Sequence, residues 1–168
     1  SLSMLPQTED ARPLYRVRQI LADRGFQEVV NYAFIEEAWE ADFAANPSPI
    51  RLANPIASQM SVMRSTLIGG LVANVATNLK RKQNRVRVFE TGRCFFRDST
   101  GTPVAGFRQP WKLAGLAYGT ALPEQWGSTA RNVDFFDIKG EIELLLAQGQ
   151  QLVHGATGAL FGLGDAFD

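Results

Sequence analysis

Residues 54–96 read NPIASQMSVMRSTLIGGLVANVATNLKRKQNRVRVFETGRCFF, and this stretch decides the fold. Asn54 and Pro55, with serines shortly after them, predict an irregular loop, because such side chains hydrogen-bond their own backbone. Apolar residues spaced four apart then predict a helix over about Leu67–Lys82. Residues 85–96 alternate and then become nearly all apolar, which indicates a strand buried on both faces.

The flanking sequence completes an α+β pattern. We expect helices over 14–24, 36–45 and 140–147, strands over 26–34, 50–52 and 111–118, a turn at 98–101 and an irregular connection over 102–109. Because the strands follow one another through turns, we predict an antiparallel β-sheet flanked by helices. Residues 1–13 are expected to be an extended lead-in, 14–147 the domain, and 148–168 a glycine-rich tail without a steady period.

The composition is that of an ordinary globular domain with balanced charge. Lys plus Arg and Asp plus Glu number 17 each, which argues against a module devoted to holding a phosphate backbone. The single cysteine, Cys94, lies in the apolar strand and is expected to be a buried thiol. We find no long apolar run and no secretory signal, so we expect a cytoplasmic chain without membrane contact. The abrupt start suggests a fragment of a longer polypeptide.

Four blocks of the chain carry a recognisable pattern. They are RQILADRGFQEVVNYAF at 18–34, NPIASQMSVMRSTLIGGL at 54–71, RVRVFETGRCFF at 85–96 and VDFFDIKGEIELLL at 133–146. Together they closely resemble the β subunit of bacterial phenylalanyl-tRNA synthetase, in the part that copies the class II synthetase catalytic fold. The resemblance implies a catalytic-like domain that does not activate phenylalanine but builds and holds the catalytic α subunit in an αβ heterotetramer.

The same resemblance sets the expectations for cofactors and partners. The holoenzyme would attach phenylalanine to its tRNA in protein synthesis, using ATP and magnesium. The family's magnesium-binding carboxylates lie in a preceding domain that this chain lacks. We therefore expect no cofactor in this chain, and we expect the α subunit and, within the holoenzyme, tRNA as partners.

The cations that hold ATP in catalytic class II synthetases have no clear counterpart here. The catalytic pattern is roughly Gly-Arg-aliphatic-aromatic-Arg, and the matching run is Gly92-Arg93-Cys94-Phe95-Phe96-Arg97. Phe96 takes the position of the ATP arginine, and Arg97 comes one residue later, which on a strand points to the other face. The glycines of Phe161-Gly162-Leu163-Gly164 resemble the family's third motif, but no arginine follows them. We therefore expect no catalytic residue in this chain.

The central loop holds the candidate functional residues. Met60, Val62 and Met63 place apolar side chains in a turn-prone segment, which indicates either a partner surface or packing under the loop. Arg64 is expected to organise the loop, because a guanidinium donates up to five hydrogen bonds in a fixed fork. The candidate interface or loop-organising residues are Asn54, Pro55, Met60, Met63, Arg64 and Leu67.

Charged clusters elsewhere admit two interpretations each. Lys80, Arg81, Lys82 and Arg85, with Arg87, could contact RNA phosphate weakly or form a solvated helix end. His154 has no metal-ligand partner nearby and is expected to be a solvated loop residue. The carboxylates of Asp134, Asp137, Glu141 and Glu143 could suggest a metal site, but Glu141 and Glu143 are expected on a solvated helix face, and Asp137 is expected to cap the helix start.

Two other functions remain open on the sequence alone. One is an active class II-like ligase whose arginines come from unexpected positions. The other is a stand-alone RNA-binding module. ATP binding would favour the ligase, and steeply salt-dependent tRNA binding would favour the RNA-binding module.

Overall fold

A computed structural model describes residues 14–127 and 129–147. The expectations for the lead-in, the tail, His154 and the 161–164 glycines lie outside these residues. The described elements are α1 (Leu14–Asp23), β1 (Gln27–Glu28), β2 (Phe34–Ile35), α2 (Glu37–Ala44), β3 (Ile50–Arg51), β4 (Val62–Met63), α3 (Ile68–Lys80), β5 (Val86–Arg93), β6 (Phe96–Arg97), β7 (Phe107–Arg108), β8 (Trp111–Tyr118) and α4 (Phe135–Ala147).

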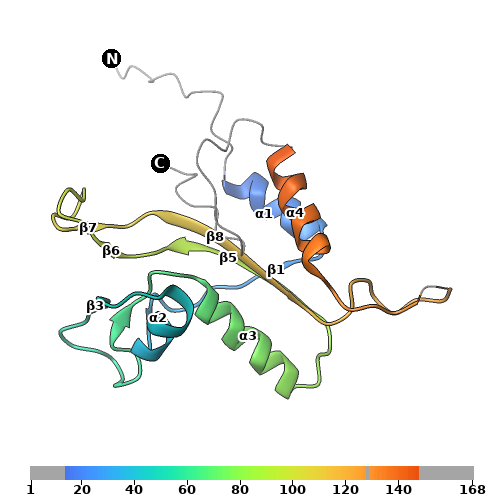
Figure 1. Cartoon of the computed structure of the whole chain (residues 1–168), viewed down its shortest axis with the longest axis horizontal. Helices are drawn as coiled ribbons and strands as arrows, with labels where there is room; N and C mark the ends of the chain where they lie inside the picture. Colours follow the sequence, from blue (N-terminus) through green and yellow to red (C-terminus); the bar gives the residue numbers. More distant parts are fainter. Residues whose placement is uncertain (1–13, 128, 148–168) are drawn as a thin grey trace, which may run out of the picture.

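The main sheet is built on the long strand pair β5 and β8, which cross the middle of the molecule (Figure 1). The two strands run antiparallel over eight residues each, from Val86 opposite Tyr118 to Arg93 opposite Trp111. This pairing confirms the predicted α+β class and the expected antiparallel return of residues 111–118. The short strand β1 adds to the other edge of β5 in a parallel direction, which the sequence pattern did not predict.

Helices cover both faces of this sheet, with α1 and α4 on one side and α3 on the other (Figure 1). Side chains alternate along β5, so Phe89 faces α1 and α4 whereas Val86 and Val88 face α3. Each face has its own apolar core: Val17, Leu21, Phe26, Phe89, Leu113 and Leu145 on the first, and Leu67, Leu71, Val75, Val86, Val88, Cys94 and Ala114 on the second. The predicted burial of β5 on both faces is confirmed.

Helix α3 matches the expected helix closely, although it ends at Lys80 rather than Lys82. The chain turns away there, and Lys82 adopts a left-handed backbone with φ of 62°. Helix α2 packs on the first turn of α3, where a Cβ on Gly69 would lie 2.9 Å from the Trp39 ring. A glycine at this position therefore permits the two helices to approach closely.

Four expected elements differ from the structure, and one of them is the irregular connection over 102–109, which contains β7 paired with β6. The expected strand over 26–34 is divided between β1 and β2, which belong to different sheets, and Val30 between them is 89% exposed. The expected irregular loop contains β4, which pairs with β2 and β3 and buries Val62 completely. Two-residue strands such as these depend on distant partners, so local sequence patterns do not show them. The last helix begins at Phe135, five residues before the expected start.

The start of α4 also corrects two residue assignments. Asp134, not Asp137, is the N-cap, because its Oδ1 accepts hydrogen bonds from the backbone N–H groups of Phe136 and Asp137. Asp137 accepts in return from the Asp134 N–H, which completes a capping box. Glu141 does not lie on a solvated face: it is 7% exposed, because it packs against arginines from two other elements. Glu143 is exposed as expected.

Candidate functional site

Arg64 lies at the junction of β4 and α3, and its side chain is buried. Its Nη1 donates to Oε1 of Glu90 at 2.6 Å, and its Nε donates to the Arg93 carbonyl at 3.1 Å. The side chains of Arg64 and Glu90 are 7% and 1% exposed. Arg64 thus ties the chain before α3 to strand β5 through a carboxylate and a backbone carbonyl, the contacts expected of a loop-organising arginine.

The Glu90 carboxylate has further donors from the segment between β1 and β2. The Asn31 backbone N–H donates to Oε1 at 3.2 Å and the Asn31 Nδ2 donates to Oε2 at 2.7 Å. The Asn31 Oδ1 in turn accepts from Asn74 Nδ2 of helix α3 at 2.7 Å. We call Arg64, Glu90, Asn31 and Asn74 the polar hub. A buried ion pair is stable only when its remaining lone pairs are satisfied, and the hub meets this condition at both Glu90 oxygens.

Gly92 leaves room for the hub. A Cβ built on Gly92 would overlap Nη2 of Arg64, and the guanidinium cannot easily move because Glu90 and the Arg93 carbonyl hold it. Gly92 has no positive φ in the structure, so the requirement is for space rather than for backbone freedom. Gly92, the second-last residue of β5, is therefore matched to Arg64.

A second buried carboxylate fixes the same junction from the other side. Glu40 of α2 is fully buried and accepts hydrogen bonds from Ser65 N at 2.8 Å, Ser65 Oγ at 2.5 Å and Asn46 Nδ2 at 2.8 Å. Sequence reasoning missed Glu40, because the helix that carries it was expected to lie on the surface. The junction at residues 64–65 is thus held by carboxylates from α2 and from β5.

A mostly apolar cavity of about 210 Å³ opens beside the hub. Tyr32, Phe34, Trp39 and Met60 contribute most of its apolar wall, and Arg64 lies at its polar side. Large apolar side chains are exposed nearby in sequence, with Tyr32 at 66% and Ile56 at 80%. A rigid apolar hollow with exposed apolar side chains on the same loops is suited to receiving a partner's side chain.

The structure sorts the six expected interface residues into three groups. Met60 and Arg64 line the cavity, and Met63 is half-buried in β4. Asn54 and Pro55 are exposed. Leu67 is 2% exposed and belongs to the apolar core under α3, so it is not available to a partner.

Phe96, which the sequence pattern assigns to the position of the ATP arginine, has an aromatic ring that packs on the core. Phe96 is half-buried against the core under α3, and Arg97 beside it is exposed. The Arg108 Cζ lies 5.1 Å and the Lys112 Nζ 4.6 Å from the Phe96 ring centroid. Both cations are thus placed over an aromatic face, an arrangement that holds them in position without a phosphate.

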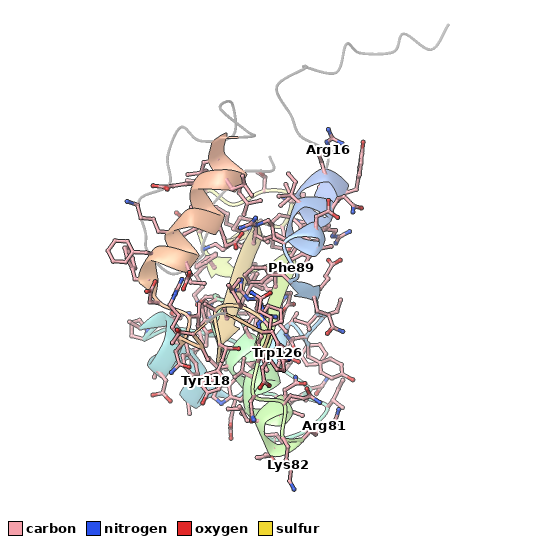
Figure 2. The ribbon with its side chains drawn as sticks, turned by 90° about the vertical axis from the view of Figure 1, so that its right-hand side faces the viewer. Arg16, Arg81, Lys82, Phe89, Tyr118 and Trp126 are labelled. Atoms are coloured by element: carbon pink, nitrogen blue, oxygen red, sulfur yellow. The ribbon has the colours of Figure 1, made fainter. Side chains whose placement is uncertain are left out.

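The structure divides the expected basic cluster. Lys80, the last residue of α3, is exposed, and so are Arg81 and Lys82 just beyond it (Figure 2 labels the latter two). Arg85 instead donates to the carbonyls of Thr120 and Ala121, at 3.1 and 3.3 Å. Arg87 is buried beneath α4, where its Nη1 lies 3.7 Å from Glu141.

Across residues 14–127 and 129–147, no group of three His, Cys, Asp or Glu side chains could hold a metal ion. Within those ranges no helix has the length and apolar character needed to cross a membrane.

Comparisons with a family model and with curated proteins agree on one family. The family described as "Phenylalanyl tRNA synthetase beta chain CLM domain" matches residues 1–154, which extends past the expected domain limits of 14–147. The chain is 64% identical over 163 residues to the "Phenylalanine--tRNA ligase beta subunit" of Dechloromonas aromatica, covering 93% of this chain and 20% of the relative. It is 65% identical over 147 residues to the protein of that name from Aromatoleum aromaticum, covering 88% and 19%. The chain thus spans about one fifth of the length of these curated relatives.

One solved structure supports the fold. A pyrrolysyl tRNA synthetase from Desulfitobacterium hafniense superposes with a TM-score of 0.50 at 16% identity, covering 86% of this chain and 48% of that one. At this identity the likeness concerns the fold alone. It agrees with the predicted class II synthetase-like core.

Proposed function

This chain belongs to the phenylalanyl tRNA synthetase beta chain family, and on that premise we propose that it is a catalytic-like scaffold domain without catalytic activity of its own. In the full enzyme it would support a catalytic α subunit in an αβ heterotetramer. That enzyme would attach phenylalanine to its tRNA in the cytoplasm, with ATP and magnesium bound outside this domain.

The observation that carries the non-catalytic role is the environment of Phe96. Stabilising the transition state of adenylate formation requires preplaced cations aimed at the phosphate oxygens. Phe96 offers none, and the two nearest cations, Arg108 and Lys112, lie over its ring. The described residues therefore do not fit the phosphates of ATP in the way that the class II pattern requires.

The scaffold role is supported by the cavity beside the polar hub. The hub fixes the chain on both sides of the cavity, because Asn31 comes from the segment before β2 and Arg64 from the start of α3. A preformed hollow loses little conformational entropy when a partner binds. We assign the contact with the α subunit to this cavity and to the exposed residues around it, including Asn54, Pro55 and Ile56.

Association with the α subunit tests this assignment. The chain is mixed with purified α subunit, and the dissociation constant is measured by calorimetry for the wild type, Ile56→Asp and Tyr32→Ala. Both substitutions are expected to weaken association at least about tenfold, because each removes apolar surface at the proposed contact. Trp126→Ala is the matched control, since Trp126 is a fully exposed aromatic residue in the loop after β8 (Figure 2).

Two outcomes distinguish failure of the scaffold role from failure of the assigned contact. No association of the wild-type chain with the α subunit would reject the scaffold role. Association that is weakened equally by all three substitutions would keep the role but reject the cavity as the contact.

One observation favours a second candidate, an active class II-like ligase. Arg108 and Lys112 lie over the ring of Phe96, and the resemblance assigns Phe96 to the position of the arginine that holds the α-phosphate in the family's catalytic members. A ligand that displaced them from the Phe96 ring would find two cations within reach. ATP titration of the isolated chain distinguishes this candidate from the scaffold.

A further inference from the structure

A second cleft, of about 390 Å³, lies where α3 ends and β5 begins, and its lining includes Asn78, one turn of α3 after Asn74 of the polar hub. Strand β1 pairs with β5 only at Val88 and Phe89, so the preceding part of that β5 edge is not covered by β1. The described residues that line the cleft include no carboxylate. They are Arg81, Arg85 and Arg87, the amides Gln27, Asn78 and Gln83, and Gly25, Val86 and Val88.

The three arginines differ in how many of their side-chain N–H groups already have an acceptor. The Arg81 side chain is exposed and has no hydrogen bond or ion pair within the described part of the chain. Arg85 uses Nε and Nη2 on the Thr120 and Ala121 carbonyls, and its Nη1 has no hydrogen bond to the described residues. Arg87 donates to the Ala121 carbonyl at 2.8 Å, while its buried Nε has no acceptor among the described residues.

Negative charge near the cleft offsets only part of this cluster. Glu141 lies 3.7 Å from Arg87, on the face covered by α4, and is shared with Arg24. Burial is the main cause that lowers the pKa of Arg87, and the charge of Arg85 lowers it further, whereas Glu141 and Asp137 act in the opposite direction. The carbonyls at the end of α3 are also occupied, since Asn78 O accepts from the N–H groups of Arg81 and Gln83.

We propose that this cleft binds a phosphate group. Arg81 and the free Nη1 of Arg85 would donate to the phosphate oxygens, and the side-chain amides of Asn78 and Gln83 would complete the shell. Lys80 and Lys82 extend the positive charge along the same end of α3, which favours a phosphate within an RNA backbone over an isolated ion. The proposal does not depend on the α subunit or on the scaffold role.

Two probes and three variants test the site. Inorganic phosphate binding is measured by calorimetry, and binding of a tRNA transcript is measured by fluorescence anisotropy from about 50 to 200 mM salt. The informative variant is Arg81→Gln, because Arg81 has no described contact that its loss would disturb. Arg85→Gln is the second variant, with thermal unfolding as a check on the 120–121 segment. Arg16→Gln is the matched control: Arg16 is an exposed arginine at the far end of the molecule from Arg81 (Figure 2).

Arg81→Gln is expected to weaken phosphate binding about tenfold, the loss of one charge-assisted hydrogen bond. It is also expected to weaken tRNA binding and to reduce the salt slope by about one phosphate contact. Arg16→Gln should change neither. Loss of affinity for both probes supports an RNA phosphate, and loss for inorganic phosphate alone supports a free phosphate ligand. The proposal is overturned if the wild-type chain binds neither probe, or if Arg81→Gln and Arg16→Gln behave alike.

Discussion

Two arginine–glutamate centres on opposite faces of the sheet use the same chemistry in different surroundings. On the α3 face, Arg64 and Glu90 have side chains 7% and 1% exposed. On the other face, Glu141 of α4 binds Arg24 through two hydrogen bonds of 2.7 and 3.0 Å, and the Arg24 side chain is 49% exposed. A similar ion pair is thus sealed from water in one case and open to it in the other.

The difference teaches which centre determines local structure. If Glu141 is removed, water can reach the half-exposed Arg24 guanidinium and replace the lost carboxylate, and Arg87, which lies 3.7 Å from Glu141, keeps its hydrogen bond to the Ala121 carbonyl. If Glu90 is removed, Arg64 stays buried with backbone carbonyls as its remaining acceptors, and Asn31 loses its acceptors as well. Removing one partner of a sealed ion pair costs much more than removing one partner of an open pair.

The largest expected effect compares Glu90→Gln with Glu141→Gln. Each substitution keeps the shape and removes the charge. Glu90→Gln should lower the free energy of unfolding by about 3–5 kcal/mol, because it leaves an uncompensated buried guanidinium. Glu141→Gln should cost about 1–2 kcal/mol, because Arg24 can be hydrated. Denaturant unfolding of both variants measures the difference, and equal losses would show that exposure does not separate the two centres.

Gly92→Ala tests whether the buried Arg64–Glu90 pair also excludes a larger side chain at position 92. The added methyl group overlaps the Arg64 guanidinium, so the variant is expected to lose about 3 kcal/mol, the upper end for overpacking. Gly140→Ala in α4 is the control, because a Cβ there meets nothing within 4 Å. It should stabilise the helix by about 0.5–1 kcal/mol. A loss of less than about 1 kcal/mol for Gly92→Ala would mean that Arg64 can move aside freely.

Arg64→Lys sharpens the comparison by keeping the charge and removing the planar fork. Lysine can reach Glu90 or the Arg93 carbonyl but cannot reproduce both contacts in the same geometry. We expect a loss of about 1–3 kcal/mol and a looser central loop. Arg16→Lys, at an exposed position, should stay within about 0.5 kcal/mol. Equal denaturant midpoints and slopes for Arg64→Lys and the wild type would show that Arg64 organises nothing.

Cys94 gives the smallest effect, and it reports on the same face as the hub. Burial raises the pKa of its thiol from an ordinary value near 9 to about 11. Because the folded pKa lies above the unfolded one, this stabilisation is complete below about pH 9 and is lost as the pH rises towards about 11. The stability difference between the wild type and Cys94→Ala should therefore shift against the wild type over that window in denaturant unfolding. If the stability difference between the two proteins were constant from pH 8 to pH 11, the burial of Cys94 on this face of the sheet would be contradicted.

Sequence reasoning predicted the elements that local pattern determines. The four-residue spacing in 67–79 and the apolar run in 85–96 correspond to α3 and β5, and Arg64 was identified from its position between loop and helix. It did not find Glu40, Glu90 or Glu141 as buried acids, because a carboxylate is buried only when partners from distant segments surround it. The partners of Glu90 are 26 and 59 residues away in sequence. The parallel β1 was missed for the same reason, since its two residues are defined by β5 alone.

ATP titration of the isolated chain tests the central claim most directly, namely that a class II-like fold is present without its phosphate clamp. Calorimetry with ATP and magnesium should show no binding up to millimolar concentration, because Phe96 replaces the cation and Arg97 lies exposed beside it. Micromolar binding of ATP would contradict the account. If Arg108→Gln or Lys112→Gln then abolished that binding, those two cations would form an ATP site in this chain.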